Sequence, residues 1–163
     1  MTPLLGELPI GLRSVSTRPL FVLRLDVRPL QLVGDTPGPY RRVGVVPGGV
    51  FEGDRLLGTV LEGGNDWQTV RSDSTTVLDV GLVLKAGGGE LIGMTYGRLR
   101  HGPPDIIKRI EAGEVLDPST HYFRINPVFE TASHQYGWLN RILAIGIGQR
   151  RSDGVTYSVF EIL

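Results

Sequence analysis

The chain has 163 residues, of which 40% are hydrophobic and 21% charged, and its formal net charge is zero. This length fits one domain, and the composition is typical of a globular protein rather than a disordered one. Because 17 Lys and Arg residues balance 17 Asp and Glu residues, neither nucleic acid nor a membrane surface is expected as a partner. A net charge near zero also removes long-range self-repulsion, so the chain is compatible with a homo-oligomer.

There is no cysteine, which excludes disulfides, a thiolate nucleophile and sulfur-ligated metal sites. His101, His121 and His134 lack metal-ligand spacing, and the glycine runs lack phosphate-binding spacing, so neither a metal nor a cofactor is predicted. The first 20 residues have no basic region typical of a signal peptide, and no apolar run approaches the roughly 18 residues of a membrane helix. We therefore expect a cytoplasmic protein.

Gly and Pro residues punctuate short apolar runs along the whole chain, which is typical of many short strands joined by turns. No linker or repeat divides it, so we predict a single β-barrel domain over residues 1–163, with residues 1–18 extended or poorly ordered. The fold class predicted is all-β, an antiparallel barrel or sandwich of roughly eight to ten strands. In chain order, the expected strands are 20–27, 41–46, 55–61, 66–71, 76–85, 90–100, 122–125, 128–131, 139–149 and 155–163.

One short helix is predicted over 103–112. Pro103 and Pro104 suit a first helical turn, and Ile106, Ile107 and Ile110 form an apolar stripe with helical spacing. We expect this helix to plug or flank one end of the barrel.

Several segments together resemble the domain of unknown function 3237 family, also called uncharacterised protein family 0311. The likeness runs from about residue 20 to the C-terminus. It is strongest in GGNDWQTVRSD, TYGRLRHGPP, HYFRINPVFETASHQYGWLNR and VTYSVFEIL. The resemblance implies a closed or nearly closed, calycin-like antiparallel barrel, often oligomeric, and it implies no particular activity.

The chain departs from the family pattern near the expected site. Asn65 stands where members usually have a small residue, and Ser74 follows Asp73 where they usually have an Asp-Gly turn. Gly81 and Leu82 stand where members often carry Arg and Tyr. The loss of two large polar side chains would enlarge a cavity.

The turns between three neighbouring strands predict which side chains share a face. A two-residue turn at Ser72-Asp73 would set Asp66 opposite Asp79, and pairing of Lys85 with Glu90 would set Asp79 opposite Tyr96. This register predicts one row of Asp66, Asp79 and Tyr96, with Gln68, Gly81, Met94 and Arg98 on the same face and Trp67, Leu78, Val80, Leu82 and Leu84 on the other.

If this row lines a cavity, it predicts acid–base chemistry. Two close carboxylates cannot both ionise easily, so Asp66 and Asp79 would act as acid and base, and Tyr96 or Arg98 would stabilise charge on oxygen. The alternative is that both carboxylates are solvated or hydrogen-bond turns. The candidate ligand-binding residues are Trp67, Gln68, Gly81, Met94, Arg98, Arg124, Trp138 and Asn140.

The sequence thus favours a cofactor-independent enzyme of isomerase, cyclase or lyase type that binds a small hydrophobic or aromatic molecule in the barrel. A non-catalytic carrier with the same barrel and a structural oligomer without a ligand stay open as alternatives. An enzyme requires titratable groups that converge in the cavity, whereas a carrier requires mostly apolar walls.

Overall fold

Strand β7 (Thr76–Ala86) shows how the sequence builds the sheet. Its even-numbered residues are buried, and its odd-numbered residues are exposed or half-buried. Because successive side chains of a strand point to opposite faces, Leu78, Val80, Leu82 and Leu84 form one apolar stripe. The stripe faces the interior of the protein in the computed structural model, which describes residues 4–163.

Within residues 4–163, twelve antiparallel strands form one continuous sheet. Eight of them pair in a closed ring, in the order β7, β8, β9, β11, β12, β1, β4 and β5, and β5 returns to β7. The predicted all-β antiparallel barrel is therefore confirmed. The strands are β1 (Thr17–Asp26), β2 (Gln31–Asp35), β3 (Tyr40–Val46), β4 (Gly48–Glu52), β5 (Leu57–Val60), β6 (Gly64–Val70), β7, β8 (Leu91–His101), β9 (Tyr122–Ile125), β10 (Val128–Glu130), β11 (Ala144–Arg150) and β12 (Gly154–Ile162).

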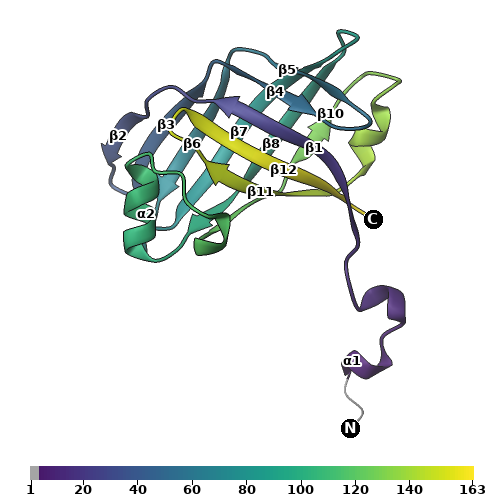
Figure 1. The fold of residues 1–163 in the computed structure, drawn as a ribbon, viewed down its shortest axis with the longest axis horizontal. Coiled ribbons are helices and arrows are strands. Elements are labelled where there is room, and N and C mark those ends of the chain that lie inside the picture. The colour runs from purple at the N-terminus through teal and green to yellow at the C-terminus, as the bar shows by residue number, and fades with distance from the viewer. Residues whose placement is uncertain (1–3) are drawn as a thin grey trace.

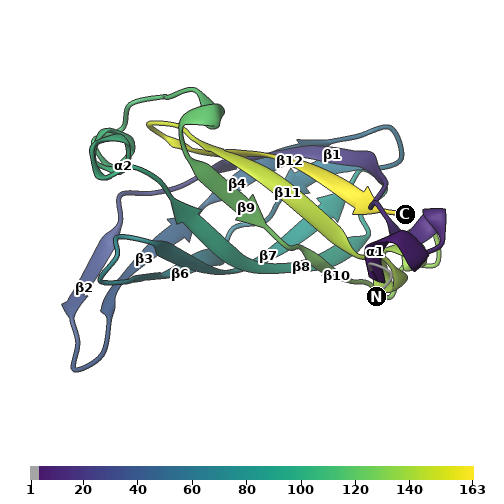
Figure 2. The same ribbon diagram turned by 90° about the horizontal axis from the view of Figure 1, so that it is seen from below.

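Strand β7 takes part in two different walls. Its first half pairs with β6, which continues to β3 and β2, whereas its second half pairs with β5. The predicted helix is present as α2 (Pro104–Glu111) and buries Ile107 and Ile110. It lies at the same end of the barrel as the projecting β2–β3 hairpin, and the described N-terminal segment and the C-terminus lie towards the opposite end (Figure 2).

Two strands and the N-terminal segment differ from the sequence prediction. Strand β4 is absent from the expected strands. A Cβ at Gly49 would collide with the backbone of Arg24 on β1, so glycine allows these strands to approach. Strand β2 exposes Leu32 and Val33 and lacks the alternation that would reveal it. Residues 4–12 contain the short helix α1 (Leu4–Glu7) and a 3₁₀ turn rather than an extended chain, and they run away from the barrel (Figure 1).

The core fills the barrel between its two ends. Leu23, Leu84, Ile92 and Met94 are fully buried, and the Phe21 ring lies 5.5 Å from that of Phe51. The strand expected over 139–149 begins only at Ala144, because Gly137–Arg141 forms a 3₁₀ helix. Among residues 4–163, no helix is long and apolar enough to cross a membrane.

Candidate functional site

Both hairpins that connect β6, β7 and β8 have three-residue loops instead of the expected two-residue or four-residue connections. Val70 pairs with Thr76, and the Arg71 N–H donates to the carbonyl of Thr75, so the loop is 72–74. The second loop is 87–89, since the Ala86 N–H donates to the carbonyl of Glu90. The third residue of each loop has a positive φ, 66° at Ser74 and 99° at Gly89, as expected for a turn followed by a bulge.

Each loop shifts the predicted register by one residue. Asp66 pairs with Val80 rather than Asp79, and Val80 pairs with Tyr96. Asp66 and Tyr96 therefore still share a row, because the two shifts cancel. Asp79 pairs with Gly97 and is exposed on the outer face, so the predicted row of two carboxylates is wrong.

Asp66 and Tyr96 line a small inner chamber at the α2 end of the barrel interior. Tyr157 on β12 lies beside them, with its ring centroid 5.3 Å from that of Tyr96 and 5.5 Å from that of Phe123. Much of the remaining wall is apolar, and the chamber volume is about 20 Å³. That is room for about one water molecule or one small group of a ligand.

The Asp66 carboxyl is desolvated, and its two oxygens differ in their hydrogen bonding. Its Oδ2 accepts a 2.6 Å hydrogen bond from Nε2 of Gln68, whereas its Oδ1 is enclosed and has no hydrogen-bond partner among residues 4–163. Burial raises the pKa of Asp66 above its ordinary value, although the Gln68 side chain, the nearby backbone of Asp79 and the charges of Arg100 and Arg150 act in the opposite direction. A carboxyl with a raised pKa and a free oxygen can exchange a proton with a bound ligand.

An ion-pair network joins this carboxyl to the helix. Gln68 accepts a 2.7 Å hydrogen bond from Nε of Arg42 on β3, and Arg42 binds both carboxylate oxygens of Glu111, at 2.6 and 2.8 Å. Arg100 on β8 donates a 2.5 Å hydrogen bond to the same carboxylate. Although burial opposes the charged form of Glu111, these arginines hold its pKa below its ordinary value. The end of α2 is thereby attached to two strands.

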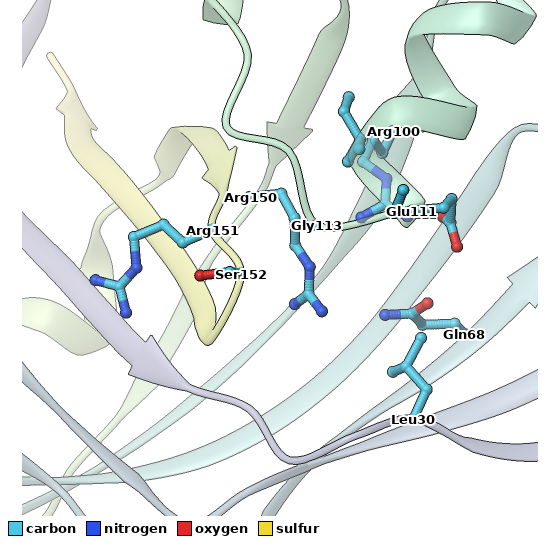
Figure 3. A pocket seen from close by; sticks show the side chains of 10 residues that line it. Leu30, Gln68, Arg100, Glu111, Gly113, Arg150, Arg151 and Ser152 are labelled. Atoms are coloured by element: carbon cyan, nitrogen blue, oxygen red, sulfur yellow. Dashed lines mark hydrogen bonds and ion pairs between the residues drawn. The ribbon is translucent and has the colours of Figure 1, made fainter.

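An outer chamber of about 230 Å³ lies between α2 and the turn that joins β11 to β12. Gln68, Arg100 and Arg150 line both this chamber and the inner one. Figure 3 shows the Arg150 side chain extending into the space between Ser152 and Gln68, whereas Arg151 points away. The site is therefore a polar outer chamber that leads to a small inner chamber containing Asp66.

The structure brings only some of the predicted ligand-binding residues to this site. Gln68 lines both chambers, and Met94 is fully buried farther along the barrel interior. Arg98 is exposed and has a φ of 114°, which departs from regular strand geometry. Gly81 is on the outer face, paired with Asn65 and Thr95, so its lack of a side chain does not enlarge the chamber.

The other predicted residues do not line either chamber. Trp67 is 44% exposed, and the guanidinium of Arg41 lies 5.6 Å from its ring centroid. Arg124 packs over Tyr122 instead of entering the barrel. Trp138 follows β10 and stacks with Arg55, and Asn140 exchanges two hydrogen bonds with the backbone of Thr131. Each of these four side chains packs against or hydrogen-bonds with other parts of the protein outside the two chambers.

Five residues of the site were not predicted: Arg42, Arg100, Glu111, Arg150 and Tyr157. Glu111 had one available signal, since it follows Ile107 by four residues and so lies on the same side of α2 as the buried stripe. Arg100 and Tyr157 follow the inward alternation of β8 and β12. Arg42 needed the strand order, because its partners Gln68 and Glu111 lie 26 and 69 positions away in the chain. Arg150 had no local signal, because its place at the site depends on how the end of β11 lies beside α2.

Comparison with known proteins assigns the chain to a family. A UPF0311 protein of Rhodopseudomonas palustris is 28% identical over 92% of this chain and 98% of its own. A solved structure of a conserved protein of unknown function from the same species has a TM-score of 0.89 at 27% identity, covering 92% and 99% of the two chains. A β-barrel-like protein of Acinetobacter baumannii has a TM-score of 0.80 at 32% identity, covering 92% and 97%.

A more distant structure, described as an enzyme from Penicillium herquei, has a TM-score of 0.69 at 20% identity, covering 91% and 95% of the two chains. This likeness is one of fold alone. Residues 15–162 match the family described as "Protein of unknown function (DUF3237)". The chain is therefore a member of the DUF3237 family, as its sequence motifs predicted.

Proposed function

We propose that this protein is a cofactor-independent enzyme of isomerase, cyclase or lyase type, with Asp66 as the residue that transfers the proton. The observation that carries the proposal is the Asp66 carboxyl, whose Oδ1 is enclosed in a chamber without a hydrogen-bond partner among residues 4–163. An unpaired carboxylate oxygen is costly to bury, so its retention at the end of an accessible chamber favours a role with a ligand.

The groups around Asp66 support an enzyme more than a carrier. Charged or titratable side chains converge on the two chambers, whereas a carrier requires mostly apolar walls. Burial raises the pKa of both Tyr96 and Tyr157. Their hydroxyls therefore stay protonated at neutral pH and can donate hydrogen bonds to a developing oxyanion.

The chemistry proposed is proton transfer at a carbon next to a carbonyl group. The C–H bond breaks, its proton passes to the ionised Asp66 carboxyl, and the electron pair moves onto the carbonyl oxygen. A tyrosine hydroxyl or the Arg100 guanidinium would stabilise the resulting enolate. Return of the proton to another atom completes an isomerisation, and expulsion of a neighbouring group completes an elimination.

A non-catalytic carrier is the second candidate. The observation that favours it is the position of Asp79 on the outer face, which leaves Asp66 as the only carboxylate in the inner chamber within the described residues. A single carboxyl can orient a ligand by one hydrogen bond without any proton transfer.

The test uses phenylpyruvate, a small enolisable carbonyl compound, in D₂O with exchange of its benzylic hydrogens followed by proton NMR. The wild type should accelerate exchange over buffer, and Asp66→Asn should reduce the acceleration by about 10²–10⁴-fold while the protein stays folded. Asp79→Asn is the matched control and should exchange like the wild type. Equal exchange by Asp66→Asn and wild type would exclude the proton-transfer role. Ligand binding without any acceleration by the wild type would support the carrier.

A further inference from the structure

Guanidinium groups outnumber carboxyl groups around the two chambers. Arg42, Arg100 and Arg150 approach this region, and the carboxyl groups of Glu111 and Asp66 oppose them. The Glu111 carboxylate accepts hydrogen bonds from both Arg42 and Arg100, so one negative charge is shared between two guanidinium groups. The site therefore retains positive charge even when both carboxyl groups are ionised.

Two of these arginines have donors that the described protein leaves unused. Arg100 is 4% exposed, and its buried Nε has no hydrogen-bond partner among residues 4–163. Arg150 makes no ion pair in the same part of the chain, and its one side-chain hydrogen bond, to the carbonyl of Gly154, is long at 3.4 Å. Its guanidinium extends towards Gln68 across the cavity (Figure 3). Guanidinium groups with free donors match the planar oxygens of a carboxylate.

We propose that the outer chamber binds the carboxylate of a small organic acid through Arg150 and Arg100. This inference rests on the proposed function in one respect, namely that the same chamber gives access to Asp66. It adds the class of substrate, which the acid–base role of Asp66 does not specify.

The dimensions of the chambers restrict the acid further. The outer chamber, at about 230 Å³, is smaller than the pockets of about 300–1,000 Å³ that hold drug-sized ligands. Because Arg100 and Arg150 line both chambers, a carboxylate bound to them lies at the junction. Only a group close to the carboxylate can then reach Asp66. The substrate is therefore a compact acid that reacts within a few bonds of its carboxylate, and Leu30 and Ile110 supply apolar contacts for its body.

The experiment compares benzoate with benzamide, which has nearly the same shape but no charge, by isothermal titration calorimetry at pH 7. Benzoate should bind at least about tenfold more tightly than benzamide, since a charge-assisted hydrogen bond contributes more than a neutral one. Arg150→Gln should weaken benzoate binding by about tenfold or more and leave benzamide binding unchanged. Arg109→Gln is the matched control, because Arg109 pairs with Glu114 on the outside of the α2 region, and it should bind benzoate like the wild type.

Arg150→Lys provides a second variant that keeps the charge but not the fork of donors. It should retain the preference for benzoate with an intermediate affinity. Equal affinities for benzoate and benzamide would overturn the inference, as would unchanged benzoate binding by a folded Arg150→Gln. Inorganic phosphate is a further probe, and binding of phosphate more tightly than benzoate would also overturn it in favour of an inorganic anion. If any of these results contradicted carboxylate binding while Asp66→Asn still lost proton exchange, the proposed function would stand and only the substrate class would be wrong.

Discussion

Asp66 and Tyr96 lie in one cross-strand row of the barrel interior, with Val80 paired to both between them. The apolar Val80 side chain separates the carboxyl from the phenol and removes water from both. This arrangement desolvates Asp66 without giving it an opposite charge in the same row. The carboxyl therefore holds its proton more tightly in the folded protein than in the unfolded chain.

Asp66→Asn should change how stability depends on pH. Since the pKa of Asp66 is raised on folding, the native state binds more protons than the unfolded state between the ordinary pKa and the raised one. The free energy of unfolding therefore falls as pH rises through that window. Asn does not titrate and can still accept the Gln68 hydrogen bond, so the variant should gain stability relative to the wild type as pH rises.

Urea unfolding across that pH range measures this difference. Asp79→Asn provides the matched control, because it makes the same change on the exposed outer face. A difference between wild type and Asp66→Asn that is the same at every pH would show that Asp66 does not titrate differently on folding.

Glu111→Gln should loosen α2 from the barrel. The change leaves the buried guanidinium groups of Arg42 and Arg100 without their carboxylate, and such a loss costs about 3 kcal/mol of unfolding free energy, reduced somewhat by the partial exposure of Glu111. Because the pKa of Glu111 is lowered on folding, this stabilisation is present above the ordinary Glu pKa and is lost as pH falls.

Chemical denaturation of Glu111→Gln at pH 7, compared with Glu114→Gln, measures this contribution. Glu114 makes an exposed ion pair with Arg109, so its replacement should leave the denaturation midpoint unchanged. Equal midpoints for the two variants would mean that the Glu111 network contributes nothing to holding the helix.

Ser74→Gly should stabilise the protein. Ser74 adopts a φ of 66°, a left-handed conformation that costs a non-glycine residue about 1 kcal/mol, and the gain should be about 0.5–1 kcal/mol once the greater freedom of glycine in the unfolded chain is included. Thermal unfolding checks the result. Ser72→Gly, at a loop position without a positive φ, should not stabilise, and a similar gain there would contradict the explanation.

Gly154→Ala and Gly81→Ala should have very different effects on stability. A Cβ at Gly154 would overlap the backbone carbonyl of Leu25 on the adjacent strand, whereas a Cβ at Gly81 has no neighbouring atom within 4 Å. The first change should cost about 1–3 kcal/mol because neither backbone can yield easily. The second should stay within about 0.5 kcal/mol of wild type. Denaturant unfolding of both variants tests this, and comparable losses would contradict the contact.

The sequence predicts the barrel well because most of its strands carry a local signal. The alternating burial of β7 and the apolar stripe of α2 follow from side-chain spacing alone. The strand register does not follow from side-chain spacing, because hairpin loops of two and of three residues have very similar sequences. Ser74 shows the difficulty, because a serine occupies a left-handed position that usually favours glycine, so the sequence signal for the three-residue loop is absent.

The candidate site was harder to predict because its contacts are not local. Arg42 and Glu111 are 69 positions apart, and only the closure of the barrel brings β3 and α2 together. The prediction that Asp66 and Tyr96 share a row is confirmed only because the one-residue register errors in the two hairpins cancelled. Gln68 was placed correctly because it lies two residues from Asp66 and so shares its face.

The eight-strand ring does not include β6 or β3, although these strands carry Asp66, Gln68 and Arg42. The hydrogen bonds that close the barrel and the side chains that line its mouth are therefore partly separate. Replacements along β6 and β3 can alter the shape and charge of the entrance while the ring stays closed. A single scaffold of this kind can acquire new specificities in this branch of the sheet while the pairing of the eight-strand ring is kept.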